Sequence, residues 1–140
     1  RYIWRNIESA TRYLTQQYGE VYSITGVAFT GKTTKQLANR VLVPSHFFKA
    51  VYIPAINQAG VYYAPNDESE RIEVISVDEL AARIGIDVLP ILDAKIKTQA
   101  FDLPLKAGES SELPDEPTDE PAWMLFVWAI FEWIIAQLQA

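Results

Sequence analysis

Two apolar runs separated by a polar loop dominate the first third of the chain. Residues 21–29 read VYSITGVAF and residues 40–52 read RVLVPSHFFKAVY, and both runs are rich in β-branched and aromatic side chains. Such runs are typical of strands that are buried on at least one face. Pro44 interrupts the second run near its beginning, so we expect it at the edge or the entry of a strand. The pattern therefore predicts two strands and a long connection.

Residues 2–18, before these runs, are predicted to form a helix. Trp4, Ile7, Leu14 and Tyr18 recur close to one stripe at helical spacing, and the glycine at position 19 is suited to end the helix.

Glu8 and Arg12 lie four residues apart and would project from the same face of that helix, one turn from each other. The spacing by itself describes an ordinary surface ion pair, worth a few tenths of a kcal/mol.

A hairpin is expected after the second run. Residues 51–53 and 61–64 are short apolar runs, and Asn57, Gln58 and Gly60 lie between them as turn residues. Because the flanking runs can pair across such a turn, the pattern predicts two antiparallel strands.

Residues 72–75 form the next strand candidate, after a polar loop. Ser76 and Glu79 have the spacing of a capping box, in which the first residue is the N-cap. A short helix through Ile84 should follow, and Gly85 should end it.

The composition changes from Leu103 onward. The stretch LPLKAGESSELPDEPTDEP is rich in Pro, Glu, Ser and Asp, which is typical of a solvated linker. Residues 122–136 then read AWMLFVWAIFEWIIA. The sequence predicts a folded body in residues 1–105, an acidic Pro-rich linker in residues 106–121 and an apolar helix in residues 122–140.

The apolar helix must be covered, because a helix that is hydrophobic all round is buried in something. Its 15-residue apolar core would be roughly 22 Å long, shorter than the roughly 30 Å of a bilayer's hydrocarbon. Two alternatives stay open. Residues 122–138 dock onto this body, a second copy or an inhibitor or other partner chain, or they contact a membrane.

The net charge of −6 has to be divided before it is interpreted. Residues 1–105 contain eleven basic and eleven acidic side chains, whereas six acidic side chains lie in residues 107–121. The body is therefore neutral and its charge does not oppose contact with a polyanion. The chain has no cysteine, so neither disulfides nor thiolate metal ligands are available.

Residues 26–33 spell GVAFTGKT, a complete match to the phosphate-binding pattern of P-loop nucleotide-binding proteins. A P-loop domain needs a following helix and a parallel sheet with crossover connections. The chain after Thr33 is too short for a crossover helix before the next strand, and a hairpin pattern follows. We therefore rank nucleotide binding at Lys32 third among the functional hypotheses.

Several segments together resemble one family. Four segments resemble the sugar-non-specific DNA/RNA endonucleases and occur in the same order as in that family. They are W-x-x-I-E-x-x-x-R at residues 4–12, VYSITGVAF, RVLVPSHFFKAVY and ISVDELAARIGIDVLPIL at residues 75–92. These enzymes belong to the ββα-metal superfamily, which includes endonuclease G-like nucleases. The resemblance covers about residues 1–93 and implies an α+β fold with a mostly antiparallel sheet and flanking helices.

The resemblance also implies site residues. Glu8 matches the glutamate that hydrogen-bonds water on the Mg²⁺, and Arg12 matches the arginine that contacts the phosphate around the scissile bond. A carboxylate can orient Mg²⁺ through water, since Mg²⁺ keeps much of its water shell. A guanidinium stabilises charge that develops on a phosphate.

Two parts of the family's site are not found in this sequence. The catalytic histidine lies in a D-R-G-H motif, which this chain does not contain. The direct metal ligand is the asparagine of N-x-x-x-W-x-x-x-E, a frame that would place it one position before Arg1. His46 is the only histidine, but it lies in a strand of the family's scaffold, and we expect a structural role with a hydrogen-bonding partner.

The leading hypothesis is the C-terminal part of a Mg²⁺-dependent endonuclease that acts on DNA and RNA. It would need an upstream segment, or a separate chain, for the histidine and the asparagine, and it would be inactive alone. The alternative is an inactive nuclease-like interaction module that acts through its apolar C-terminal helix. The family implies a secreted or periplasmic bacterial location, with an organellar location as the alternative.

Overall fold

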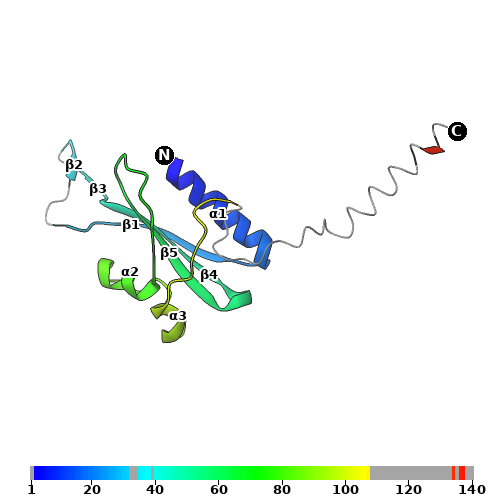
Figure 1. The fold of residues 1–140 in the computed structure, drawn as a ribbon. Coiled ribbons are helices and arrows are strands. Elements are labelled where there is room, and N and C mark those ends of the chain that lie inside the picture. The colour runs from blue at the N-terminus through cyan, green and yellow to red at the C-terminus, as the bar shows by residue number, and fades with distance from the viewer. Residues whose placement is uncertain (1, 32–34, 39, 108–133, 135, 138–140) are drawn as a thin grey trace.

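The computed structural model describes residues 2–31, 35–38, 40–107, 134 and 136–137. Its elements, in order, are α1 (Tyr2–Tyr18), β1 (Tyr22–Ala28), β2 (Lys35–Leu37), β3 (Val41–Val43), β4 (His46–Ile53), the 3-10 turn η1 (Pro54–Ile56), β5 (Gln58–Pro65), β6 (Glu73–Ile75), α2 (Val77–Ile84) and α3 (Ala94–Thr98). Figure 1 shows their arrangement.

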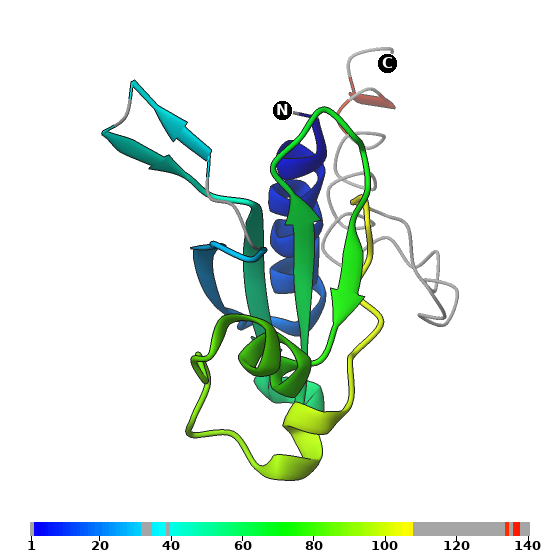
Figure 2. The same cartoon turned by 90° about the vertical axis from the view of Figure 1, so that its left-hand side faces the viewer.

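An antiparallel sheet with the strand order β1-β4-β5-β6 lies at the centre of the fold. Helix α1 packs along one face of this sheet, and α2 and α3 lie on the other face (Figures 1 and 2). Strands β2 and β3 form a separate antiparallel ribbon. The predicted α+β class with a mostly antiparallel sheet and flanking helices is therefore confirmed, and the arrangement is consistent with the ββα-metal nuclease fold.

Alternation along β4 explains why both faces of the sheet are covered. Phe48 and Ala50 belong to the apolar cluster under α2, whereas Val51 and Ile53 belong to the cluster under α1. Successive side chains of a strand point to opposite faces, so an almost continuous apolar run indicates burial on both sides. The sequence had specified burial on at least one face.

The predicted second strand is divided in two. Pro44 and Ser45 separate β3 from β4, because proline has no backbone N–H for the ladder. Pro44 thus lies at a strand entry, as expected. The hairpin of β4 and β5 is also confirmed, but its turn is formed by η1 and by Asn57 in the left-handed region at φ 51°. Gln58 and Gly60, predicted as turn residues, belong to β5.

The P-loop hypothesis is contradicted by the sheet. Gly26 lies within β1, paired with Phe48 of β4, and a Cβ at position 26 would stand 2.4 Å from the Phe48 ring. A phosphate-binding loop needs its first glycine at the end of a strand that leads into a helix, whereas here the strand continues to Ala28 and the sheet is antiparallel. Lys32 and Thr33 lie outside the described residues.

The segment after α3 returns to the sheet and forms part of the body. The Phe101 N–H donates to the Ala59 carbonyl at 2.8 Å, and Leu103 is buried in the cluster under α1. The Tyr62 hydroxyl donates to the Pro104 carbonyl at 2.5 Å. The first residues of the LPLKAGESS stretch therefore pack on the folded body, although the composition of the stretch is typical of a solvated linker.

The predicted linker and apolar helix lie almost wholly outside the described residues. Within the described ranges, no helix has the length and apolar character needed to cross a membrane.

Candidate active site

Helix α1 is fixed to the sheet by its apolar stripe. Ile7, Ala10 and Leu14 are fully buried, and the Thr11 hydroxyl donates to the Ile7 carbonyl at 2.8 Å, so this buried polar group is satisfied. The helix ends at Gly19, whose φ of 82° is the left-handed conformation that glycine favours. The helix therefore presents a fixed outer side to solvent.

Glu8 lies at the margin of that outer side and is tied to the sheet. Its Oε1 accepts a hydrogen bond from Lys49 Nζ at 2.8 Å. The Lys49 side chain is 6% exposed, whereas the Glu8 side chain is 41% exposed. The ion pair thus joins α1 to β4 and leaves the carboxylate open to solvent on one side.

Arg12 is exposed one helical turn after Glu8. The surface pair expected from the spacing is not the contact that Glu8 makes, because its carboxylate turns toward Lys49 instead. The structure therefore places the side chains of Glu8 and the exposed Arg12 on neighbouring turns of one helix.

A groove with a volume of about 330 Å³ lies beside the N-terminal turn of α1. The rings of Trp4 and Phe47 line it, with their centroids 6.0 Å apart. Its lining residues are Ile3, Trp4, Phe47, the last two residues of β5 and the loop residues 66–70. The loop contributes Asp67, Glu68 and Glu70, so this side of the groove carries acidic side chains. Hydrogen bonds from Ser69 hold the pKa of Asp67 below its usual value.

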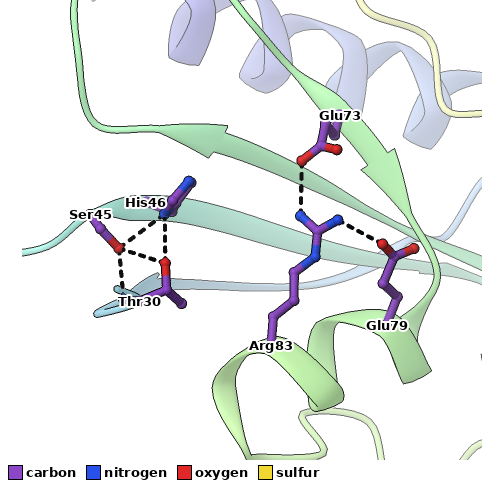
Figure 3. A network of polar contacts seen from close by, with 6 residues as sticks. All are labelled: Thr30, Ser45, His46, Glu73, Glu79 and Arg83. Atoms are coloured by element: carbon purple, nitrogen blue, oxygen red, sulfur yellow. Dashed lines mark hydrogen bonds and ion pairs between the residues drawn. The ribbon is translucent and has the colours of Figure 1, made fainter. Parts of the chain in front are cut away.

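His46 is at the beginning of β4, away from Glu8 on the other face of the sheet. Its Nδ1 lies 2.9 Å from Ser45 Oγ and 3.1 Å from Thr30 Oγ1 (Figure 3). Its ring stacks on Tyr63 with the centroids 4.6 Å apart. The structure supplies the hydrogen-bonding partners that the sequence analysis expected for this ring.

Arg83 forms a second polar cluster on the same face as His46. Its guanidinium donates to Glu73 at 2.8 Å and to Glu79 at 2.6 Å (Figure 3), and it lies 4.8 Å from the centroid of the Tyr63 ring. The hydrogen bond from Arg83 lowers the pKa of Glu73. This cluster ties α2 to β6 and is a structural feature of the scaffold.

The described residues do not form a complete metal site. No three His, Cys, Asp or Glu side chains in this part of the chain lie close enough together to hold a metal ion. The Glu8 carboxylate has one oxygen held by the Lys49 ammonium, so its other oxygen can accept a hydrogen bond from water.

Lys49 was missed by sequence reasoning, although a signal existed. Alternation places it between Phe47 and Val51 on the face of β4 that α1 covers. Lysine is almost never fully buried unless it is paired. A lysine in the buried phase of a strand therefore predicts a carboxylate on the covering element, and α1 offers Glu8.

Comparison with known proteins gives the family. The pattern of the DNA/RNA non-specific endonucleases matches residues 1–95. Mitochondrial endonuclease G of Homo sapiens is 28% identical over 110 residues, which is 66% of this chain and 37% of the human protein, and the Bos taurus protein matches to the same extent. No solved structure matches the chain significantly. The family's pattern covers more than half of the chain, and the chain therefore belongs to the DNA/RNA non-specific endonuclease family.

Proposed function

We propose that this chain contributes the metal-site helix and the central sheet of a Mg²⁺-dependent endonuclease that hydrolyses phosphodiester bonds in DNA and RNA. One observation carries the proposal. Helix α1 holds a half-exposed carboxylate, Glu8, by a buried ammonium, and it presents the exposed guanidinium of Arg12 one turn away. These are the two positions that the family uses for metal-bound water and for phosphate.

The two side chains have separate roles in the proposed reaction. Arg12 donates hydrogen bonds to the phosphate at the scissile bond and stabilises the charge that grows there as water attacks. Glu8 accepts a hydrogen bond from water and so fixes the orientation of that water. A bound Mg²⁺ would supply Lewis-acid stabilisation of the leaving oxygen.

The general base and the direct metal ligand would come from a segment outside residues 1–140. The family's D-R-G-H motif is not in this sequence, and the chain spans 37% of the length of the curated relatives that it matches. We propose that the missing segment either precedes this one in the same polypeptide or associates with it as a separate chain. Residues 1–140 alone would then not cleave.

The proposed substrate contacts are to the backbone. A neutral body with an exposed arginine suits contacts with phosphate and sugar, which position a nucleic acid without reading its sequence. This mode of contact leaves the base edges unread, so cleavage without base preference is expected. The matched relatives carry the description mitochondrial, so we favour the organellar alternative for location over a secreted or periplasmic one.

The test is a plasmid-nicking and RNA-degradation assay in Mg²⁺, run on this chain alone and with the D-R-G-H segment co-expressed. Cleavage in the reconstituted sample that falls at least 10-fold in Glu8→Ala and in Arg12→Ala supports the proposal. Arg40→Ala is the control, because Arg40 is also exposed but lies at the turn between β2 and β3. Cleavage by the chain alone, or equal loss in the control, contradicts the site assignment.

A second candidate function is an inactive nuclease-like interaction module. One observation favours it, which is that β1 lies at the edge of the sheet and exposes apolar side chains, with Tyr22 at 54% and Val27 at 47%. No cleavage in the reconstituted sample, together with a dimer or partner complex that is lost on truncation at Glu120, would support this function. Binding of residues 122–138 to lipid vesicles would instead indicate membrane contact.

A further inference from the structure

Lys49 occupies a position where an ammonium is costly. It lies on β4, paired with Thr25 of β1 and Tyr62 of β5, and its side chain is 6% exposed beneath α1. Moving an ammonium from water to such a place is unfavourable unless it is paired and hydrogen-bonded. An apolar residue of similar length would fill the same space without this penalty.

The geometry of the pair is asymmetric. Lys49 Nζ contacts one carboxylate oxygen of Glu8, Oε1, at 2.8 Å. Within the described part of the chain, no other hydrogen bond or ion pair to Glu8 is present. The lysine side chain is 6% exposed between the sheet and the helix, whereas the glutamate side chain is 41% exposed. The ion pair therefore fixes the more accessible partner.

We infer that Lys49 is a positioning residue for Glu8. It holds the Glu8 carboxylate through Oε1, which leaves Oε2 to accept a hydrogen bond from metal-bound water. The inference rests on the proposed function, since Glu8 has to act at the metal site for its orientation to matter. Lys49 touches neither substrate nor metal in this role.

The pairing has a functional rather than a stabilising rationale. Replacing a buried ion pair by apolar side chains is often neutral or stabilising, so a buried pair by itself is weak evidence of a stability role. Residues that orient groups near a metal typically change affinity or activity by about 10- to 100-fold when they are replaced. Lys49→Met removes the buried charge of the pair and leaves the 41% exposed Glu8 to be solvated, so it should damage catalysis more than folding.

The experiment uses the reconstituted nuclease and compares wild type, Lys49→Met, Glu8→Ala and the double variant. Lys49→Met is expected to lower kcat by about 10- to 100-fold with little change in KM for DNA, and to raise the Mg²⁺ concentration needed for half-maximal rate. In the Glu8→Ala background the same substitution should cost less than about 3-fold, because its target is gone. Lys49→Arg, which retains the charge, should recover part of the rate.

Lys97→Met is the matched control. Lys97 also forms an ion pair, at 2.6 Å with Asp87, and its side chain is 14% exposed, but the pair lies on the α3 side of the sheet. Removing it should leave cleavage within about 2-fold of wild type.

A readout without turnover is Mn²⁺ binding, followed by loss of the free-ion electron paramagnetic resonance signal. Lys49→Met is expected to weaken this binding, and Lys97→Met is not. Thermal unfolding of each variant separates a local effect from loss of the fold.

The outcomes distinguish this inference from the proposed function. An active wild type with Lys49→Met within 3-fold of it, or equal losses from Lys49→Met in the wild-type and Glu8→Ala backgrounds, overturns the positioning role and leaves the nuclease intact. A change in KM alone also overturns it. A wild type that neither cleaves nor binds Mn²⁺ overturns the proposed function, and the positioning role with it.

Discussion

Leu103→Ala should destabilise the whole body, although the stretch whose composition resembles a linker begins at this residue. Leu103 is 1% exposed and packs in the same apolar cluster as Ile7 and Leu14 of α1. It also lies over Gly60 of β5, where a Cβ would be only 3.1 Å from Leu103 Cγ. The leucine thus fills space that the glycine leaves open, and truncation would create a cavity.

The expected loss is about 3 kcal/mol in the free energy of unfolding, within the usual 2–5 kcal/mol for a buried leucine. Collapse around the cavity is limited, because the backbone on either side is held by the Phe101 N–H to Ala59 carbonyl bond and by the Tyr62 hydroxyl on the Pro104 carbonyl. A domain of this size has roughly 5–15 kcal/mol of stability in total. The loss would therefore be a large fraction of it.

Urea denaturation followed by tryptophan fluorescence and by circular dichroism measures the effect. Leu105→Ala is the matched control, since this leucine is two residues further on and 41% exposed, and it should cost less than about 1 kcal/mol. A Leu103→Ala midpoint equal to that of Leu105→Ala would refute the assignment of this segment to the folded body.

Three further predictions concern the scaffold. Gly60→Ala should lower the free energy of unfolding by about 1–3 kcal/mol, because the new Cβ would stand 2.8 Å from the Phe101 carbonyl oxygen. Denaturant titration measures this change, and an unchanged midpoint would contradict the prediction. The pKa of Glu73 is lowered by the hydrogen bond from Arg83, so the folded state binds its proton less readily than the unfolded state, and stability is lost as the pH falls from about 5 toward 3. Arg83→Met should reduce this acid sensitivity in urea titrations at pH 7 and pH 3, and an identical pH dependence in wild type and variant would argue against it. Ser76→Ala removes the hydroxyl that accepts from the Glu79 N–H at 3.1 Å and should cost about 1 kcal/mol, whereas a loss below about 0.3 kcal/mol would show that the cap is dispensable.

Local signals predicted most of the elements, because they depend on neighbours in the sequence. The stripe from Trp4 to Tyr18, the capping box at Ser76 and the glycines that end α1 and α2 all act over one helical turn. Apolar runs also identified the strands.

The errors arose where turn-type residues such as glycine and asparagine have more than one structural use. The strand limits near Gln58 were wrong, because a 3-10 turn followed by a left-handed Asn57 closes the hairpin earlier than turn composition suggests. The P-loop pattern misled for a related reason. A glycine can serve a loop or, as at position 26, make room for the ring of a residue on the paired strand, and the sequence does not distinguish these uses.

The sequence by itself determined the neutral body, the acidic tail, the α+β class and, through its resemblance, the family and the candidate pair Glu8 and Arg12. The tertiary structure alone decided which charges meet. Glu8 and Lys49 are 41 residues apart, and their contact depends on how α1 packs across β4. Helical periodicity placed Arg12 next to Glu8. An unpaired ammonium at the buried Lys49 would cost more free energy than an unpaired guanidinium at the exposed Arg12, so the carboxylate pairs with Lys49. Desolvation, which sequence spacing does not encode, therefore selected the partner.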